Sequence, residues 1–191
     1  MDRILEQIKN FADQAHGDQQ RKYSPERYIA HPVRVMQTCR KYSSKLPVLA
    51  AALLHDVVED TEVGSRELEE YLSSVLSKED VAHTMKLVIE LTDVYTKEAY
   101  PRLNRKRRKA KESERLETTS GDAQTIKYAD IMDNCRAIGK SDNDFALVFL
   151  KECSELLNKM TKGKKELWDE ARTIVDEELG KLHQTGVSRG K

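Results

Sequence analysis

The sequence predicts an all-α fold, and three observations support this prediction. Glycine and proline, which interrupt helices, are scarce, with 8 and 4 among 191 residues. Strand-like alternation of apolar and polar residues is hard to find, whereas Leu, Ile, Val and Ala recur at helical intervals. The length suits one domain of ordinary size. We expect this domain to cover residues 1–185, with a frayed tail at 186–191.

Three helices are expected in the first third of the chain. Apolar residues share one face from Ile4 to Ala15, which predicts the first helix. A polar loop from His16 to Tyr28 follows. IAHPVRVMQTCRKY then predicts a second helix with Pro32 in its first turn, where proline is well tolerated. The third helix is expected to begin near Pro47 and to run through LAAALLHDVVED.

Two amphipathic helices should follow. Ser65 is expected as the N-cap of SRELEEYLSSVL, in which Leu68, Leu72 and Leu76 form an apolar stripe. The next helix should run from Lys78 to Leu91. Its inward residues are expected to be Val81, Met85, Val88 and Ile89.

The composition changes after this point. Residues 93–118 have few large apolar groups and a basic cluster, so they form either a surface helix or a mobile segment. AQTIKYADIMDNCRAI is expected to be a helix again. Its candidate core residues are Ile126, Ala129, Met132 or Cys135, and Ile138. Two further helices, about Asp144–Met160 and Gly163–Leu182, should complete the domain.

The charge composition excludes several classes of partner. Lys plus Arg and Asp plus Glu number 33 each, so no global field favours nucleic acid or an anionic bilayer. The longest apolar run is far shorter than the roughly 20 residues of a membrane helix. MDRILEQIKN lacks the apolar core of a secretory signal, so we expect a cytoplasmic protein. Three widely spaced cysteines without a CxxC pair suit reduced core thiols: Cys39, Cys135 and Cys153.

The stretch LLHDVVEDT places ionisable groups directly after an apolar run. On a helix, His55 and Glu59 share a face, as do Asp56 and Asp60. Half-buried groups of this kind are costly unless they are hydrogen-bonded, paired or bound to a cation. Glu59 and Asp60 would also suit a solvated helix end. The pattern indicates either such an end or a metal site.

Two other residues are candidate metal ligands. His31 stands at the start of a helix, and Asp130 interrupts the apolar face of TIKYADIMDN. With His55 and Asp56 they offer two imidazole nitrogens and two carboxylates, a set that suits manganese, iron, cobalt or zinc. Taken singly, His31 would also suit a hydrogen-bonded core histidine and Asp130 a solvated residue.

Three stretches, AHGDQQRKYSPERYIAHP, AALLHDVVEDT and IKYADIMDN, resemble the signature stretches of the hydrolase domain of the RelA/SpoT family. This family lies within the HD superfamily of metal-dependent phosphohydrolases. The resemblance covers about residues 1–160 and is closest to the small stand-alone alarmone hydrolases, which include the animal SpoT-homologue type. It implies an HD-domain helical bundle.

The resemblance also implies an activity. It makes His31, His55, Asp56 and Asp130 the ligands of one manganese ion per chain. Glu59 and Asp60 match the acidic pair that positions and activates the attacking water. The implied reaction hydrolyses the 3′-pyrophosphate of guanosine tetra- or pentaphosphate and releases pyrophosphate with GDP or GTP. A carboxylate near a metal-activated water is suited to accept its proton.

Three substrate contacts follow from the same resemblance. Arg21 and Lys22 match a pair that packs on guanine and reaches phosphate, and Asn134 matches an asparagine near the sugar or phosphate. Without the resemblance, Arg21 and Lys22 would suit a plain surface loop. The chain departs from the family pattern at Ala137, which offers no side-chain hydrogen bond, and also at Tyr128 and Asp133.

The basic run RKRRKAK, Arg105 to Lys111, allows two interpretations. It could be the solvated face of a helix, paired at i,i+4 with the acids of ESERLE. It could instead steer a highly charged nucleotide into the site. Nucleic-acid binding is disfavoured because no aromatic platform accompanies the run.

Two rival functions remain open. The first is hydrolysis of another nucleotide, in particular removal of the 2′-phosphate of NADPH. The second is a non-catalytic nucleotide sensor, against which the acidic pair Glu59 and Asp60 argues. The sequence predicts neither the oligomeric state nor a preference between tetra- and pentaphosphate.

Overall fold

The computed structural model describes residues 1–22, 24–138 and 143–187. Within these residues no strand forms, and the β pairing is one isolated bridge between Gln20 and Arg27. The prediction of an all-α fold is confirmed. The helices are α1 (Asp2–His16), α2 (Ala30–Arg40), α3 (Leu46–Leu54), α4 (Val57–Asp60), α5 (Ser65–Val75), α6 (Lys78–Leu91), α7 (Arg105–Thr118), α8 (Gly121–Ile138), α9 (Asn143–Lys159) and α10 (Lys165–Val187).

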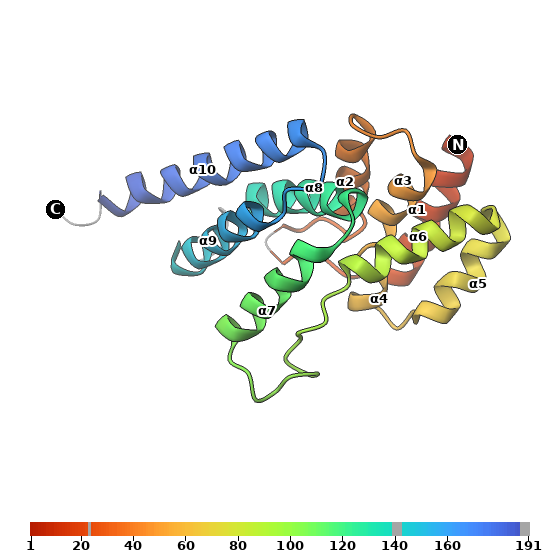
Figure 1. Ribbon diagram of the computed structural model, residues 1–191, viewed down its shortest axis with the longest axis horizontal. Coiled ribbons are helices and arrows are strands. Elements are labelled where there is room, and N and C mark those ends of the chain that lie inside the picture. The colour runs from red at the N-terminus through yellow and green to blue at the C-terminus, as the bar shows by residue number, and fades with distance from the viewer. Residues whose placement is uncertain (23, 139–142, 188–191) are drawn as a thin grey trace.

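Helix α3 runs through the middle of the bundle. Every residue from Pro47 to Leu54 is buried, because α1, α2, α6 and α8 surround the helix (Figure 1). A helix that is apolar all round suits such a buried position. Burial of each of its leucines contributes about 1.5–3 kcal/mol. His55 follows the last turn of α3, so this packing fixes the position of its imidazole.

Helix α8 is the second buried helix, in contact with α2, α3, α6, α9 and α10. All the core residues predicted for it are buried: Ile126, Ala129, Met132, Cys135 and Ile138. Gly163, in the turn before α10, packs closely on this helix. A Cβ atom at Gly163 would lie 2.4 Å from Cε2 of Tyr128, so a larger residue does not fit there. The packing holds Asp130 in a fixed place relative to α2 and α3.

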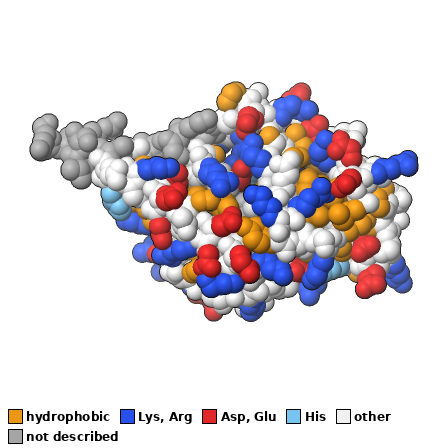
Figure 2. Space-filling model, turned by 90° about the horizontal axis from the view of Figure 1, so that it is seen from above, with side chains coloured by type: hydrophobic (Ala, Val, Ile, Leu, Met, Phe, Trp, Pro, Cys, Tyr) orange, Lys and Arg blue, Asp and Glu red, His pale blue; other side chains and the backbone are white. Residues whose placement is uncertain are grey.

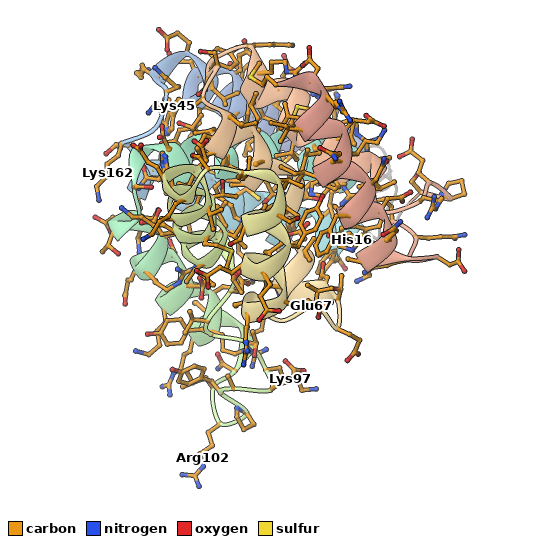
Figure 3. All side chains as sticks on the ribbon, turned by 90° about the vertical axis from the view of Figure 1, so that its right-hand side faces the viewer. His16, Lys45, Glu67, Lys97, Arg102 and Lys162 are labelled. Atoms are coloured by element: carbon orange, nitrogen blue, oxygen red, sulfur yellow. The ribbon has the colours of Figure 1, made fainter. Side chains whose placement is uncertain are left out.

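The segment whose structure the sequence left open divides into two parts. Residues 92–104 form no helix, and Arg105–Thr118 form α7, which packs against α9 at the edge of the bundle. Lys97 and Arg102 lie on the connecting loop, and Arg102 is far from the helical body (Figure 3). The interpretation as a surface helix therefore holds for the second part.

Three local expectations need correction. The helix expected from Pro47 through Asp60 is interrupted at His55 and Asp56, which leaves α4 as a single turn. Ser65 is the first residue of α5 rather than its N-cap, because Gly64 occupies that position. Ile89 is 47% exposed rather than inward-facing. Thr84 and Leu87 are buried in α6 beside Val81 and Val88.

The ends and the surface agree with the composition. Part of the tail expected to fray, residues 186 and 187, belongs to α10, and residues 188–191 lie outside the described part of the chain. On the face shown in Figure 2, basic and acidic side chains are interspersed. No helix within the described residues is long and apolar enough to span a membrane. All three cysteines are buried and free, as predicted.

Candidate active site

Two buried histidines meet where α2 and α3 pack together. His31 in the first turn of α2 is 1% exposed, and His55 at the end of α3 is 2% exposed. Their ring centroids lie 5.3 Å apart. His55 Nδ1 lies 3.0 Å from the carbonyl oxygen of Ala52, which can only accept a hydrogen bond. Nδ1 therefore carries the proton, and the lone pair of His55 Nε2 is directed into the site.

Two carboxylates face the same imidazole nitrogens. Asp56 Oδ2 lies 3.2 Å from His55 Nε2 and 3.5 Å from His31 Nε2. Asp130 Oδ1, from α8, lies 3.2 Å from His31 Nε2 and 3.8 Å from His55 Nε2. The four residues that the sequence nominated as ligands thus come together from α2, the α3–α4 junction and α8.

The donor set fits a divalent metal ion. Candidate ligand atoms of His31, His55 and Asp56 lie within 4.8 Å of one another. His55 Nε2 is buried and makes no well-aligned hydrogen bond, although Asp56 Oδ2 lies 3.2 Å away, and this is costly unless the nitrogen binds a cation. Burial alone would lower the pKa of His31, but hydrogen bonds with Asp130, Asp133 and Asp56 raise it to about 10. The carboxylates therefore favour a positive charge here, as a proton or as a metal ion.

Asp133 orients the first histidine from behind. Its Oδ2 accepts a hydrogen bond from His31 Nδ1 at 2.7 Å, which directs His31 Nε2 toward Asp56 and Asp130. Arg34 Nε donates to Asp133 Oδ1 at 2.5 Å. Burial raises the pKa of Asp133, but His31 and Arg34 outweigh this effect and lower it to about 2. Carboxylate partners of this kind commonly fix metal-ligating imidazoles.

Lys127 supplies a fixed positive charge beside the carboxylates. Its Nζ lies 2.8 Å from Asp130 Oδ2, the oxygen other than the one that faces the histidines. Burial disfavours the ammonium form, but Asp130 and Asp93 raise the pKa of Lys127 above its usual value. Lys127 is therefore charged at neutral pH and holds Asp130 in one orientation.

The acidic pair after the histidine is held by two contacts from other elements. The Tyr28 hydroxyl lies 2.7 Å from Asp56 Oδ2 and 3.0 Å from Asp60 Oδ2, so it bridges a candidate ligand and a candidate catalytic acid. The backbone N–H of Asp93 donates to Glu59 Oε2 at 2.9 Å. Partial desolvation and the Asp93 carboxylate raise the pKa of Glu59 to about 7. A carboxylate with this pKa is suited to accept a proton at neutral pH.

A cavity of about 370 Å³ opens in front of these groups. It is lined by the carboxylates of Asp56, Glu59, Asp60 and Asp130 and by the rings of Phe145 and Phe149 from α9. Asn134 also lines it. A candidate metal site and aromatic rings in the lining of one cavity together suit a ligand with phosphate groups and a ring system.

The candidate substrate residues differ in their positions. Asn134 Nδ2 donates to Asp130 Oδ1 at 2.6 Å, and Arg21 Nη2 donates to Asn134 Oδ1 at 2.9 Å. Arg21 is therefore linked to the metal-ligand group through Asn134. Lys22 Nζ lies 5.2 Å from the ring centroid of Phe145, a residue that lines the cavity.

The basic run of α7 contributes to the cavity wall. Arg105 and Lys109 line it. Arg105 pairs with Glu152 of α9, and Lys109 Nζ lies 2.9 Å from Asp93 Oδ2. These two cations thus contact acids of other segments, not the i,i+4 acids of their own helix. The face that carries Arg105 and Lys109 is part of the site.

Sequence reasoning did not assign roles to four residues of this site: Tyr28, Asp93, Lys127 and Asp133. The sequence could have indicated three of them by their spacing. Tyr28 lies three residues from His31, and Lys127 and Asp133 each lie three residues from Asp130, so each shares a helical face or turn with a candidate ligand. Asp93 had no such spacing, since its partner Glu59 is 34 residues away.

Comparisons with known proteins identify the family of this chain. The sequence model of the HD domain family matches residues 28–135. Guanosine-3′,5′-bis(diphosphate) 3′-pyrophosphohydrolase MESH1 of Mus musculus is 35% identical over 140 residues, which cover 71% of this chain and 70% of that protein. The protein of the same name from Homo sapiens gives the same identity and coverage.

A solved structure confirms the HD-domain helical bundle. A metazoan orthologue of SpoT matches this chain with a TM-score of 0.70 and 24% sequence identity. The match covers 93% of this chain and 94% of that one.

Proposed function

Because the chain belongs to the HD domain family, we propose that it is a metal-dependent phosphohydrolase that removes the 3′-pyrophosphate of guanosine tetra- or pentaphosphate. The observation that carries this proposal is the convergence of two imidazoles and two carboxylates beside Glu59 and Asp60. Relatives at 35% identity are named for this reaction, which supports the choice of substrate.

We propose manganese as the metal, one ion per chain, held by His31, His55, Asp56 and Asp130. Mixed nitrogen and oxygen donors suit a borderline divalent ion. When bound, such an ion lowers the pKa of water and neutralises charge on a phosphoryl oxygen. Asp133 and the Ala52 carbonyl keep the two imidazoles in the required tautomer and orientation.

The remaining steps depend on side chains of the chain itself. Glu59 accepts the proton of the attacking water, since its pKa of about 7 leaves a large ionised fraction at neutral pH. Asp60, held by the Tyr28 hydroxyl, orients that water. The bond between the 3′ oxygen and its phosphorus breaks, the water oxygen goes to phosphorus, and the 3′ oxygen gains a proton. The products are pyrophosphate and GDP or GTP.

The nucleotide is proposed to lie along the cavity. Asn134 contacts its sugar or phosphate, and Arg21 with Lys22 packs on the guanine and reaches phosphate. The hydrogen bond between Arg21 and Asn134 and the position of Lys22 over Phe145 support this placement. Arg105 and Lys109 add positive charge to the wall near the catalytic acids and attract the polyanion.

Two broader assignments accompany this proposal. We propose that residues 1–185 act as a single domain, since helices from both ends of this range pack on α3 or α8. We also propose a cytoplasmic location, because three free cysteines suit a reducing compartment.

Side-by-side turnover tests the substrate assignment. Purified protein loaded with manganese is incubated with ppGpp, pppGpp and NADPH, and the release of pyrophosphate and orthophosphate is measured. We expect pyrophosphate from the guanosine nucleotides with the higher kcat/KM. More efficient release of orthophosphate from NADPH would replace the proposed substrate. A folded, metal-loaded protein that turns over none of the three would be a nucleotide sensor.

A further inference from the structure

One face of α7 binds the segment that follows α6. Lys109, Glu112 and Arg115 are spaced three residues apart, which places them on the same side of the helix. All three contact residues 90–95, which include the last turn of α6 and the start of the long loop. We call these three residues the α7 clamp.

Glu112 is the central residue of the clamp. It is 3% exposed, and its Oε2 accepts hydrogen bonds from the backbone N–H groups of Val94 and Tyr95, both at 3.0 Å. Its Oε1 accepts a hydrogen bond from Arg115 Nε at 2.7 Å. A buried carboxylate is tolerated only when it is paired and hydrogen-bonded in this way. Glu112 therefore determines the path of the backbone at residues 94 and 95.

The other two clamp residues hold the segment on either side of this point. Arg115 donates to the carbonyl oxygens of Glu90 at 2.9 Å and Thr92 at 3.1 Å, which caps the end of α6. Lys109 pairs with the Asp93 carboxylate. Asp93 is thus bounded by fixed groups on both sides, and its backbone N–H has a fixed direction.

That N–H group reaches a catalytic candidate. It donates to Glu59 Oε2 at 2.9 Å, across 34 residues of sequence. Glu59 is exposed and stands on α4, a single turn of helix, so its own helix gives it little support. We propose that Glu112 is a positioning residue for Glu59 and acts through the backbone of Asp93. This inference rests on the proposed function, in which Glu59 accepts the proton of water.

The inference gives the charged sequence of α7 a specific role. The α7 clamp holds residues 90–95 in the position that orients Glu59. Glu114, on the same helix, is exposed to solvent. A displacement of about 1 Å at a catalytic group is enough to lower a rate on the order of a hundredfold. A clamp that fixes one backbone N–H is therefore expected to affect kcat more than substrate affinity.

The test uses Glu112→Gln, with Glu114→Gln as the matched control on the exposed part of the helix. An amide at position 112 cannot accept from the Val94 and Tyr95 N–H groups and from Arg115 at the same time. We expect kcat for ppGpp to fall at least tenfold in Glu112→Gln, with KM within twofold of wild type and bound metal unchanged. Glu114→Gln should retain wild-type kcat.

A double-mutant cycle separates positioning from a general loss of stability. If Glu112 acts through Glu59, Glu112→Gln should lower kcat no further in a Glu59→Gln background. An equal loss of kcat in both backgrounds would overturn the inference. Where the Gln variant fails to fold, Glu112→Asp keeps the charge but draws the carboxylate back by one methylene, and the same cycle applies.

Amide hydrogen exchange keeps this inference distinct from the proposed function. We expect the amides of Asp93, Val94 and Tyr95 to be protected in wild type and to exchange faster in Glu112→Gln. If wild type turns over no ppGpp, the proposed function fails, and exchange at Asp93 decides whether the clamp exists. Unchanged protection of the Asp93 amide in the variant would show that Glu112 does not hold it.

Discussion

The two halves of the candidate site are built by different means. The half that holds the candidate metal ligands lies inside the bundle, where His31, His55 and Asp130 are at most 5% exposed and stand on or next to helices packed in the apolar core. The half that holds the candidate catalytic acids lies at the surface, where Glu59 and Asp60 stand on a single turn and are held by hydrogen bonds from Asp93 and Tyr28. The first half derives its rigidity from packing, and the second from a few polar contacts.

Because of this difference, substitutions in the two halves should have different effects. Substitution in the buried half should remove the metal itself, whereas substitution in the surface half should leave the metal and the fold in place and lower the rate. Four substitutions and one pH profile can test this distinction.

His55→Ala should abolish both metal binding and turnover. The variant removes an imidazole whose Nε2 is directed at the other candidate ligands. Metal analysis of purified protein should show about one transition-metal ion per wild-type chain and none in the variant. His83→Ala, which removes a half-exposed histidine outside this group, should keep the metal. Full metal content in His55→Ala would remove His55 from the ligand set.

Glu59→Gln should lower kcat by about 10²–10⁴-fold, the usual contribution of a general base. Metal content should stay at the wild-type level because Glu59 is not among the nominated ligands. Combining this change with Asp60→Asn should abolish turnover while the metal remains. Loss of metal in either variant would contradict the division between the two halves.

Asp133→Asn should weaken metal binding about 10–100-fold, as is typical when the carboxylate behind a metal-ligating histidine is replaced. The amide keeps the size of the side chain but removes the charge that holds the proton on His31 Nδ1. Competition with a chelator of known affinity measures the effect. Asp169→Asn, an exposed residue of α10, serves as the control. If Asp133→Asn and wild type had equal metal affinity, His31 would not need Asp133 in order to bind the metal.

The rate should depend on pH through Glu59. Its raised pKa, about 7, means that the carboxyl group is protonated below that pH and cannot accept a proton there. The profile of kcat should therefore fall about tenfold per pH unit on the acidic side. A bound cation stabilises the carboxylate, so the midpoint is expected at or below pH 7. This decrease of kcat at low pH should be absent in Glu59→Gln. If it persisted in the variant, the ionisation of a group other than Glu59 would cause it.

Tyr28→Phe should have the smallest effect, a decrease of about 2–10-fold in kcat, which corresponds to one hydrogen bond. The hydroxyl contacts both Asp56 and Asp60, so the variant tests the boundary between the halves. If kcat falls and metal affinity is unchanged, the contact of Tyr28 with Asp60 is the important one. If metal affinity is weaker, the contact with Asp56 matters. A kcat and a metal affinity both equal to wild type would mean that neither contact matters.

The sequence predicted the buried half more completely than the surface half, and the reason is physical. Helical periodicity identifies residues that face a core, so α8 and its buried positions could be read directly, and a histidine or carboxylate within such a pattern is conspicuous. Asp133 and Lys127 could have been found in the same way, since both lie one turn from Asp130.

The surface half depends on contacts that periodicity does not encode. Glu112 reads as one acid among several in a charged helix, and nothing local indicates that it binds two backbone N–H groups of the preceding loop. The interruption at His55 and Asp56 was missed for a related reason, because HDVVED contains neither glycine nor proline. A contact between segments distant in the sequence decides the role of Glu112.

Lys127 has a consequence for stoichiometry. Many carboxylates bridge two metal ions by giving one oxygen to each. In this chain the Asp130 oxygen that would bind a second ion is already 2.8 Å from the Lys127 ammonium. We therefore expect the Lys127 ammonium to disfavour a second metal ion at this oxygen, which would make the proposed centre mononuclear. A titration with manganese should then saturate at a single equivalent.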